Sequence, residues 1–539
     1  MKSFAQAPER RTVVVPKNDR FAAFGSALLL RPDETLLCSY TRVEFERDTV
    51  QKVLITSADR GRTWSEPRLV EQVRGPASRS SRAESLTRLR DGRIALISNV
   101  ESGKEHPDGF KIRFSSDDGV TWTDPAHVGR GTVPWCNRIV ETDEDDLLIT
   151  CRAPHDFDPV AEGALSTKVV MQYRSQDHGH TWEGPEIIAQ ATNLKLTEPS
   201  VIRLRDGRLM CAVRETSYVD FPSYRIFSGD GGRTWSPIQE MPLCGHELYL
   251  GQLHSGRVMV AYRNVGGYSG TLAWVGDPDE QAGFQVPATL RCQHPPELVD
   301  GRLKIRTDGQ GETALYHLHS PEGPQSTIRL RVELRCLFNQ KNACAVHVAQ
   351  AGWVSFYPEG VELPDCGLSA RLDATRFHCY EIVRDESELR LAVDGEQILA
   401  TRQLHRVRVQ ETFYGDVFYD NVTTFGTRSP FFGDLEAEAA GFAEWRSVEM
   451  HIANPNHPSH EYRWDARSGL APNHYEEDRM IEIENNYGGN LYFVGQVAWV
   501  QFADGEIFMV SGRQYARADG RRSSWLRGCI LYEQDFGSA

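Results

Sequence analysis

The chain has 539 residues and a formal net charge of −15, with 60 Lys and Arg residues against 75 Asp and Glu residues. It is too long for one compact core, so two domains are expected. The acidic balance argues against nucleic acid or an anionic membrane as a partner, and no window approaches the roughly 20 apolar residues of a membrane span.

The N-terminal residues have no apolar signal core, which favours a cytoplasmic location. The 11 cysteines are scattered as single positions without a C-x-x-C pair. We therefore expect buried, reduced thiols and not a disulfide framework or a zinc site. The sequence has no metal-ligand spacing, phosphate loop or nucleotide fingerprint, so no metal and no cofactor are expected.

An octapeptide of the pattern S-x-D-x-G-x-T-W occurs four times, beginning at Ser57, Ser115, Ser175 and Ser228. This spacing indicates one supersecondary unit repeated around an axis or along a solenoid. In each copy the Asp can accept backbone N–H bonds, the Gly supplies a positive φ, and the Trp fills the space under the turn. The motif residues are expected to be structural staples and not catalytic groups.

Each repeat reads as four short strands with tight turns, which is the sequence form of a propeller blade. Inner hairpin turns of one form occur at Pro32-Asp33, Asp91-Gly92, Glu144-Asp145, Asp206-Gly207, Ser255-Gly256 and Asp504-Gly505. They predict an all-β fold with a six-bladed β-propeller, in which blades five and six lack the octapeptide. The apolar stretch at residues 11–16 is expected to close the ring by completing blade six.

The repeat pattern breaks between blades five and six, where other alternating strands appear. A strand and hairpin with the sequence V-D-G-x-x-I, starting at Val393, resemble the jelly-roll sandwich of the concanavalin and laminin-G type. The predicted domains are blades one to five (1–284), an inserted β-sandwich (285–451) and blade six (452–539). The expected role of the sandwich is scaffolding, with carbohydrate contact as the alternative.

Blade geometry places the functional site on the face opposite the octapeptides, where the starts of first strands and the ends of second strands converge on the axis. The strand ends supply Glu84, Glu198, Glu247, Arg152, Arg214 and Arg263, and the loops supply Glu46, Asp48, His106, His155 and Tyr218. A Glu is followed sixteen residues later by an Arg in two blades, which puts both side chains at one rim. A structural salt bridge is the alternative interpretation of each pair.

The repeated octapeptide on a six-bladed pattern resembles the sialidase superfamily, in which the motif is called the Asp box. The resemblance covers the chain outside the insertion. It implies that Glu198 polarises a tyrosine nucleophile and that Arg214 grips a substrate carboxylate through bidentate hydrogen bonds. It also implies the acid/base role for Glu46 or Asp48.

Two positions depart from the family pattern. Where the family has an arginine opening blade one, this chain has Phe24 and Gly25, and Arg20 could substitute only if its loop bends back. Gln496 stands at the position of the blade-six tyrosine. Without that arginine and that nucleophile, sialic acid is not the expected substrate.

A pocket lined by carboxylates and arginines predicts an exo-acting glycoside hydrolase that cleaves a terminal acidic or rare sugar from an oligosaccharide. One alternative is a lyase in which an arginine neutralises a uronate and His106, His155 or Tyr218 takes the C5 proton. The other is a non-catalytic, lectin-like propeller. The sequence leaves the sugar, the linkage and the oligomeric state open.

Overall fold

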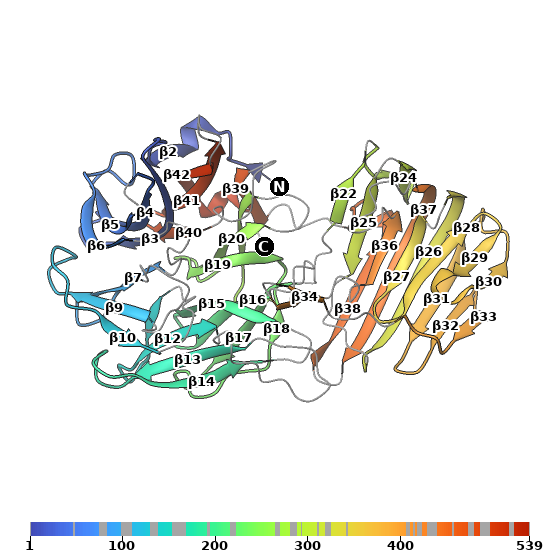
Figure 1. Ribbon diagram of the computed structural model, residues 1–539, viewed down its shortest axis with the longest axis horizontal. Coiled ribbons are helices and arrows are strands. Elements are labelled where there is room, and N and C mark those ends of the chain that lie inside the picture. Colours follow the sequence, from blue (N-terminus) through green and yellow to red (C-terminus); the bar gives the residue numbers. More distant parts are fainter. Residues whose placement is uncertain are drawn as a thin grey trace.

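Six β-sheets arranged around an axis and one two-sheet sandwich make up the computed structural model (Figure 1). The structure describes residues 2–46, 49–74, 84–98, 110–129, 138–152, 169–190, 195–215, 222–264, 270–280, 288–292, 294–309, 312–318, 325–340, 343–405, 410–412, 415–417, 423–427, 439–454, 457–472, 479–485, 496–516 and 522–537.

Four blades each consist of four consecutive antiparallel strands. Blade one contains β3 (Phe21–Leu30), β4 (Leu36–Glu44), β5 (Thr49–Ser57) and β6 (Arg68–Arg74). Blade two contains β7 (Glu84–Arg88), β8 (Ile94–Ser98), β9 (Phe110–Ser115) and β10 (Ala126–Val128). Blade three contains β11 (Ile139–Glu141), β12 (Leu147–Arg152), β13 (Val170–Ser175) and β14 (Glu183–Ala189). Blade four contains β15 (Leu196–Arg203), β16 (Leu209–Glu215), β17 (Tyr224–Ser228) and β18 (Gln239–Glu240).

The last two blades take strands from distant parts of the chain. Blade five contains β19 (Gly245–Gln252), β20 (Val258–Asn264), β21 (Gly270–Gly276), β39 (Met480–Asn485) and, at its edge, β1 (Lys2–Ser3). Blade six contains β40 (Val497–Gln501), β41 (Glu506–Ala516), β42 (Arg522–Tyr532) and β2 (Arg11–Val15). The pairing of β2 with β42 confirms that the N-terminal strand completes blade six.

The six inner strands form a closed cycle. Each of β3, β7, β11, β15, β19 and β40 contacts the next, and β40 contacts β3. The turn after each inner strand carries the same backbone hydrogen bond, from residue i to residue i+4, as in Arg31 N to Thr35 O and Leu204 N to Arg208 O. The predicted six-bladed propeller is therefore confirmed, including the six hairpin turns.

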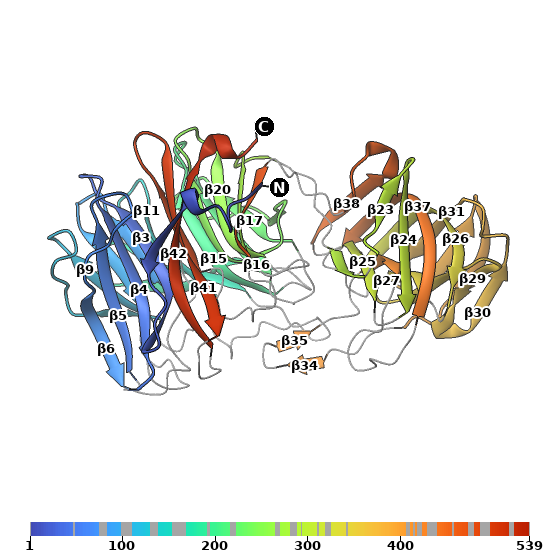
Figure 2. The same cartoon turned by 90° about the horizontal axis from the view of Figure 1, so that it is seen from above.

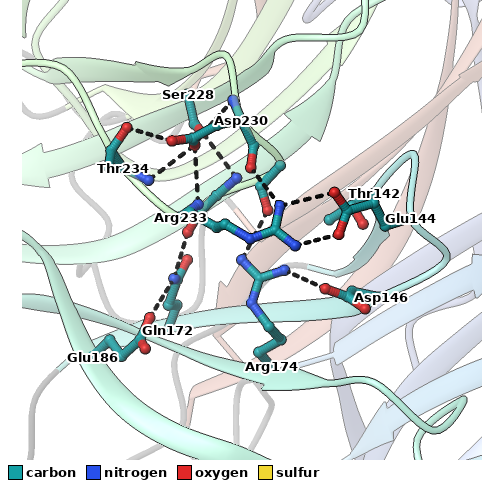
Figure 3. A network of polar contacts seen from close by, with 12 residues as sticks. Thr142, Glu144, Asp146, Gln172, Arg174, Glu186, Ser228, Asp230, Arg233 and Thr234 are labelled. Atoms are coloured by element: carbon teal, nitrogen blue, oxygen red, sulfur yellow. Dashed lines mark hydrogen bonds and ion pairs between the residues drawn. The ribbon is translucent and has the colours of Figure 1, made fainter.

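The octapeptides form the turns between the third and fourth strands of blades one to four. In all four copies the Ser hydroxyl donates to the Asp carboxylate at 2.8 Å and the Thr hydroxyl donates to it at 2.6 Å. Figure 3 shows how the blade-four copy is also held by blade three, where Glu144 pairs with Arg233 and Arg174 donates to the carbonyl of Gly231. These turns thus join blades as well as strands.

The sandwich packs two sheets around one shared apolar core. One sheet contains β22 (Ala288–Arg291), β25 (Thr313–Leu318), β36 (Thr423–Thr427), β27 (Cys344–Val348), β28 (Gly352–Tyr357), β29 (Gly360–Leu363) and β30 (Leu368–Arg371). The other contains β23 (Glu297–Val299), β24 (Arg302–Gly309), β37 (Ala439–Asn454), β26 (Thr327–Asn339), β31 (His378–Arg384), β32 (Leu389–Val393), β33 (Glu396–Thr401) and β38 (His457–Asp465). Figure 2 shows the sandwich beside the propeller, with the hairpin of β34 (Gln410–Thr412) and β35 (Gly415–Val417) between them.

The strand pairing places the insertion differently from the expected boundaries. The sandwich enters after β21 and the chain returns at β39, so it interrupts blade five and does not separate blades five and six. Its C-terminal limit also lies beyond residue 451, because β38 pairs with β37 up to Asp465. The two ends of the insertion meet at an ion pair between Glu280 and Arg479. They meet at the turn where blades one to four carry the octapeptide, which explains its absence from blade five.

Only short 3-10 helices occur among the described residues: η1 (Pro8–Arg10), η3 (Pro364–Cys366), η4 (Ala466–Ser468) and η7 (Glu533–Asp535). Within this part of the chain, no helix has the length and hydrophobicity required to cross a membrane. The described cysteines are free thiols, and most are buried.

Candidate active site

Glu198 and Glu247 occupy the same place in adjacent blades, six residues before the inner turn. Both interrupt the strand pairing with a bulge, and both have a left-handed backbone, with φ of 47° and 53°. Gly25 holds this place in blade one with φ of 58°. A glutamate is strained in this conformation, whereas glycine is not. Such strain is concentrated at functional sites, so its repetition marks this rim of the propeller.

The Glu198 side chain is buried and both of its oxygens are engaged. Oε1 is paired with Nη1 of Arg214, and Oε2 accepts a hydrogen bond from the Glu247 backbone N–H at 3.0 Å. Burial alone would raise the pKa of Glu198, but the charges of Arg214 and Arg263 together with these hydrogen bonds hold it below its ordinary value. Glu198 is therefore a fixed anion.

A second pair lies directly beside the first. Nη1 of Arg263 is 3.4 Å from Oε1 of Glu247, and both side chains are less than a tenth exposed. Nη2 of Arg263 lies 3.2 Å from Nδ1 of His246, its cross-strand neighbour. Burial lowers the pKa of His246 well below its ordinary value, and the Arg214 and Arg263 charges lower it further. His246 is consequently a neutral group that accepts an N–H bond from Arg263.

Arg152 takes the corresponding position in blade three, six residues after the inner turn, as Arg214 and Arg263 do in blades four and five. It lies half-buried at the end of β12, opposite Val170. Arg513 of blade six follows its own turn by seven residues and is 29% exposed. Four consecutive blades thus present an arginine near one rim.

The blade-one candidates lie at the same end of the propeller but are more exposed. Glu46 is exposed in the turn after β4 and has no hydrogen-bond or ion-pair partner among the described residues. Arg20 is also exposed, and its carbonyl accepts a hydrogen bond from the Phe45 N–H at 3.0 Å. No contact joins either side chain to Glu198 in the part of the chain that the structure describes.

The remaining candidates are not in register with Glu198 and Glu247 or lie outside the described residues. Glu84 begins β7, but it lies five residues before its turn and is one residue out of register with Glu198 and Glu247. Four predicted residues lie outside the described residues: Asp48, His106, His155 and Tyr218. His246 was not among the residues predicted from the sequence. Its position directly before Glu247, in a blade with the Glu–Arg spacing, was the available signal.

Glycans are a chemically suitable class of ligand for such a rim, because fixed carboxylates and arginines recognise hydroxyl and acidic groups. No group of His, Cys, Asp and Glu among the described residues could hold a metal ion. The fold and this rim together define a β-propeller with a cluster of buried charges at one rim.

Residues 34–298 match the family described as a BNR repeat-like domain. The match runs from β4 of blade one to β21 of blade five and into the first strands of the sandwich, and it confirms the predicted resemblance to the sialidase superfamily for this part of the chain. No curated protein sequence matches the chain.

Three solved structures are similar to this chain at low sequence identity. A Dyadobacter fermentans protein of unknown function has 16% identity and a TM-score of 0.41, covering 58% of this chain and 95% of its own. Trypanosoma rangeli sialidase in complex with sialic acid has 10% identity and a TM-score of 0.37, covering 83% and 96%. Penicillium chrysogenum α-L-arabinanase complexed with arabinobiose has 15% identity and a TM-score of 0.39, covering 56% and 93%.

Proposed function

We propose that this protein is a glycoside hydrolase that removes a terminal acidic sugar from an oligosaccharide. The observation that carries the proposal is the pair of strained, buried glutamates in adjacent blades, each bound to an arginine at one rim. A structural salt bridge needs no left-handed glutamate, because an extended residue at the end of a strand could reach the same arginine. The repeated strain indicates that the position of the carboxylates matters.

The two sides of the rim would divide the chemistry. Glu198 is held as an anion, so it suits the stabilisation of positive charge that develops on the sugar as the glycosidic bond breaks. A group with a lowered pKa is a poor proton donor, so the acid must come from elsewhere. Glu46 and Asp48 of blade one supply the candidate acid/base groups, and their loop would have to approach the substrate.

The arginines would select the substrate. Arg152, Arg214 and Arg263 occupy equivalent positions in three consecutive blades, and the proposed ligand is a sugar carboxylate such as that of a uronic acid. Sialic acid is not our proposed substrate. Gly25 and Gln496 stand where the sialidase family has an arginine and the nucleophilic tyrosine.

The test is a screen of the full-length protein against aryl glycosides and oligosaccharides with neutral and acidic terminal sugars, followed by product analysis. Release of an intact acidic monosaccharide is the expected result, and the Glu198→Gln variant should not release it. A 4,5-unsaturated uronate product would show a lyase instead. Binding of glycans without any turnover would favour the lectin-like alternative.

A further inference from the structure

The interface between the facing sheets of blades five and six, called the seam below, becomes polar toward the rim that carries the candidate active site. Over most of its depth it is apolar, with Val275, Ile481, Met509 and Leu531 packed in one cluster. Near the rim the same faces of the two sheets carry charged and hydroxyl groups. Cross-strand pairing places Arg263, Thr271 and Glu484 in one row on blade five, facing blade six.

Three arginines of blade six converge on one carboxylate in this part of the seam. Glu484 is completely buried and pairs with Arg11, with Nη1 of Arg527 at 3.1 Å and with Nη1 of Arg513 at 3.7 Å. Arg11 is 5% exposed and Arg527 is 12% exposed. One negative charge cannot neutralise three guanidinium groups, and an uncompensated buried charge is costly.

The electrostatic response of the arginines agrees with this imbalance. Burial lowers the pKa of Arg11 to about 10. The Cys529 thiol, which hydrogen-bonds to Arg11, opposes this shift, whereas the positive charges of Arg527 and Arg513 add to it. Burial and Arg513 also lower the pKa of Arg527. The three cations repel one another, so a further anion between them would be stabilised.

Polar atoms without a hydrogen-bond partner in the residues that the structure describes lie beside these ion pairs. Thr271 and Ser511 are fully buried, yet neither hydroxyl has a hydrogen-bond partner among the described residues. Thr271 is the cross-strand neighbour of Glu484, and Ser511 is that of Arg527. Nε and Nη1 of Arg11 also lack an oxygen acceptor in the described part of the chain. Buried polar groups normally have hydrogen-bond partners, and a ligand with several acceptor oxygens would supply them to these atoms.

We propose that the seam between blades five and six binds an oxyanion, held by Arg11, Arg513 and Arg527 and by the hydroxyls of Thr271 and Ser511. A carboxylate, sulfate or phosphate group has the charge and the acceptor oxygens that this set of donors requires. Arg513 is the most exposed of the three arginines and marks the entrance. The oxyanion is either a free inorganic ion or an acidic group of a sugar. This site is separate from Glu198 and does not depend on the proposed hydrolase activity.

The experiment measures the melting temperature of the full-length protein in sulfate, phosphate or D-glucuronate against chloride at equal ionic strength. A ligand that binds only the folded state and is present at about ten times its Kd should raise the melting temperature by about 1 °C. Stabilisation by sulfate or phosphate identifies an inorganic-anion site. Stabilisation by glucuronate alone identifies a site for an acidic sugar.

Matched variants locate the effect. Ser511→Ala and Arg513→Gln should remove the anion-dependent stabilisation. Ser355→Ala should keep it, because the Ser355 hydroxyl is equally buried and unpartnered but lies in the sandwich. Arg376→Gln should also keep it, because Arg376 is 81% exposed in the sandwich. Glu198→Gln should leave the effect intact even if the protein has no hydrolase activity.

Two results would overturn the proposal. One is a wild-type protein that none of the three anions stabilises beyond chloride, which would mean that the seam holds only water. The other is equal stabilisation in all variants, which would mean that the anions act elsewhere. Ser511→Ala removes an unpartnered hydroxyl and is expected to fold, so it decides the matter if Arg513→Gln does not fold.

Discussion

Carboxylates on the two faces of the propeller lie in opposite environments, exposed on one face and buried on the other. On the octapeptide face, Asp59, Asp117, Asp177 and Asp230 make the same short hydrogen bonds in four blades and lie in an exposed turn. On the opposite rim, equivalent positions carry Gly25, Glu198, Glu247 and Gln496, and the two glutamates are buried beside arginines. A hydrogen-bonded turn that recurs unchanged identifies the scaffold, whereas a buried charge at a backbone position that holds Gly or Gln in other blades identifies a candidate site.

The strongest test of this comparison is activity. Once a substrate is identified, Glu198→Gln should lower kcat by a factor of about 10² to 10⁴, because it removes an anion that stabilises the transition state. Glu144→Gln is the matched control, since Glu144 also pairs with an arginine, but on the octapeptide face. It should retain wild-type kcat. Wild-type turnover in folded Glu198→Gln would refute the proposed role of this carboxylate.

The Glu–Arg pairs at the rim also contribute to the free energy of unfolding, and this contribution can be measured separately from catalysis. Arg214→Gln leaves Glu198 buried without its charged partner and should lower the free energy of unfolding by about 3 kcal/mol. The double variant Glu198→Gln, Arg214→Gln should recover a large part of this loss, as measured by urea unfolding. Additive losses would show that the two side chains do not depend on each other.

The blade architecture could be predicted from the sequence because local signals repeat. Each octapeptide and each hairpin turn determines its own geometry, and four to six copies in phase leave little choice of fold. The exact place of the insertion could not be predicted, since the outer strand of blade five, β39, follows the sandwich in the chain. Pairing of β21 with a strand some 200 residues later has no local sequence signal.

The candidate site was predictable only in part. The spacing of sixteen residues correctly joined Glu198 to Arg214 and Glu247 to Arg263. It could not indicate that the Glu247 N–H binds Glu198, because this contact crosses between blades. The cluster around Glu484 was missed for the same reason, as its arginines come from both ends of the chain.

The tryptophans of the octapeptides should matter for stability alone. Trp122 packs against the apolar cluster between blades one and two, so Trp122→Ala should lower the free energy of unfolding by about 2 kcal/mol through a packing cavity. The folded fraction should keep its full activity per molecule. An inactive but fully folded Trp122→Ala protein would contradict the assignment of the octapeptides to the scaffold.

The smallest expected effect is the pH dependence of the stability that one octapeptide turn contributes. Hydrogen bonds from the Thr121 hydroxyl and backbone N–H, with a further bond from Ser115, lower the pKa of Asp117 from 3.8 to about 2. Since the folded-state pKa is below the unfolded one, this carboxylate stabilises the protein above about pH 4, and the contribution is lost as the pH falls toward 2.

Asp117→Asn removes the titrating group but keeps an acceptor oxygen. The variant should therefore be less stable than the wild type in urea unfolding at pH 7, and the difference should shrink between pH 4 and pH 2. Asp124→Asn makes the same chemical change just outside the turn and serves as the control. A stability difference that stays constant over this pH range would mean that Asp117 acts through the shape of the turn and not through its charge.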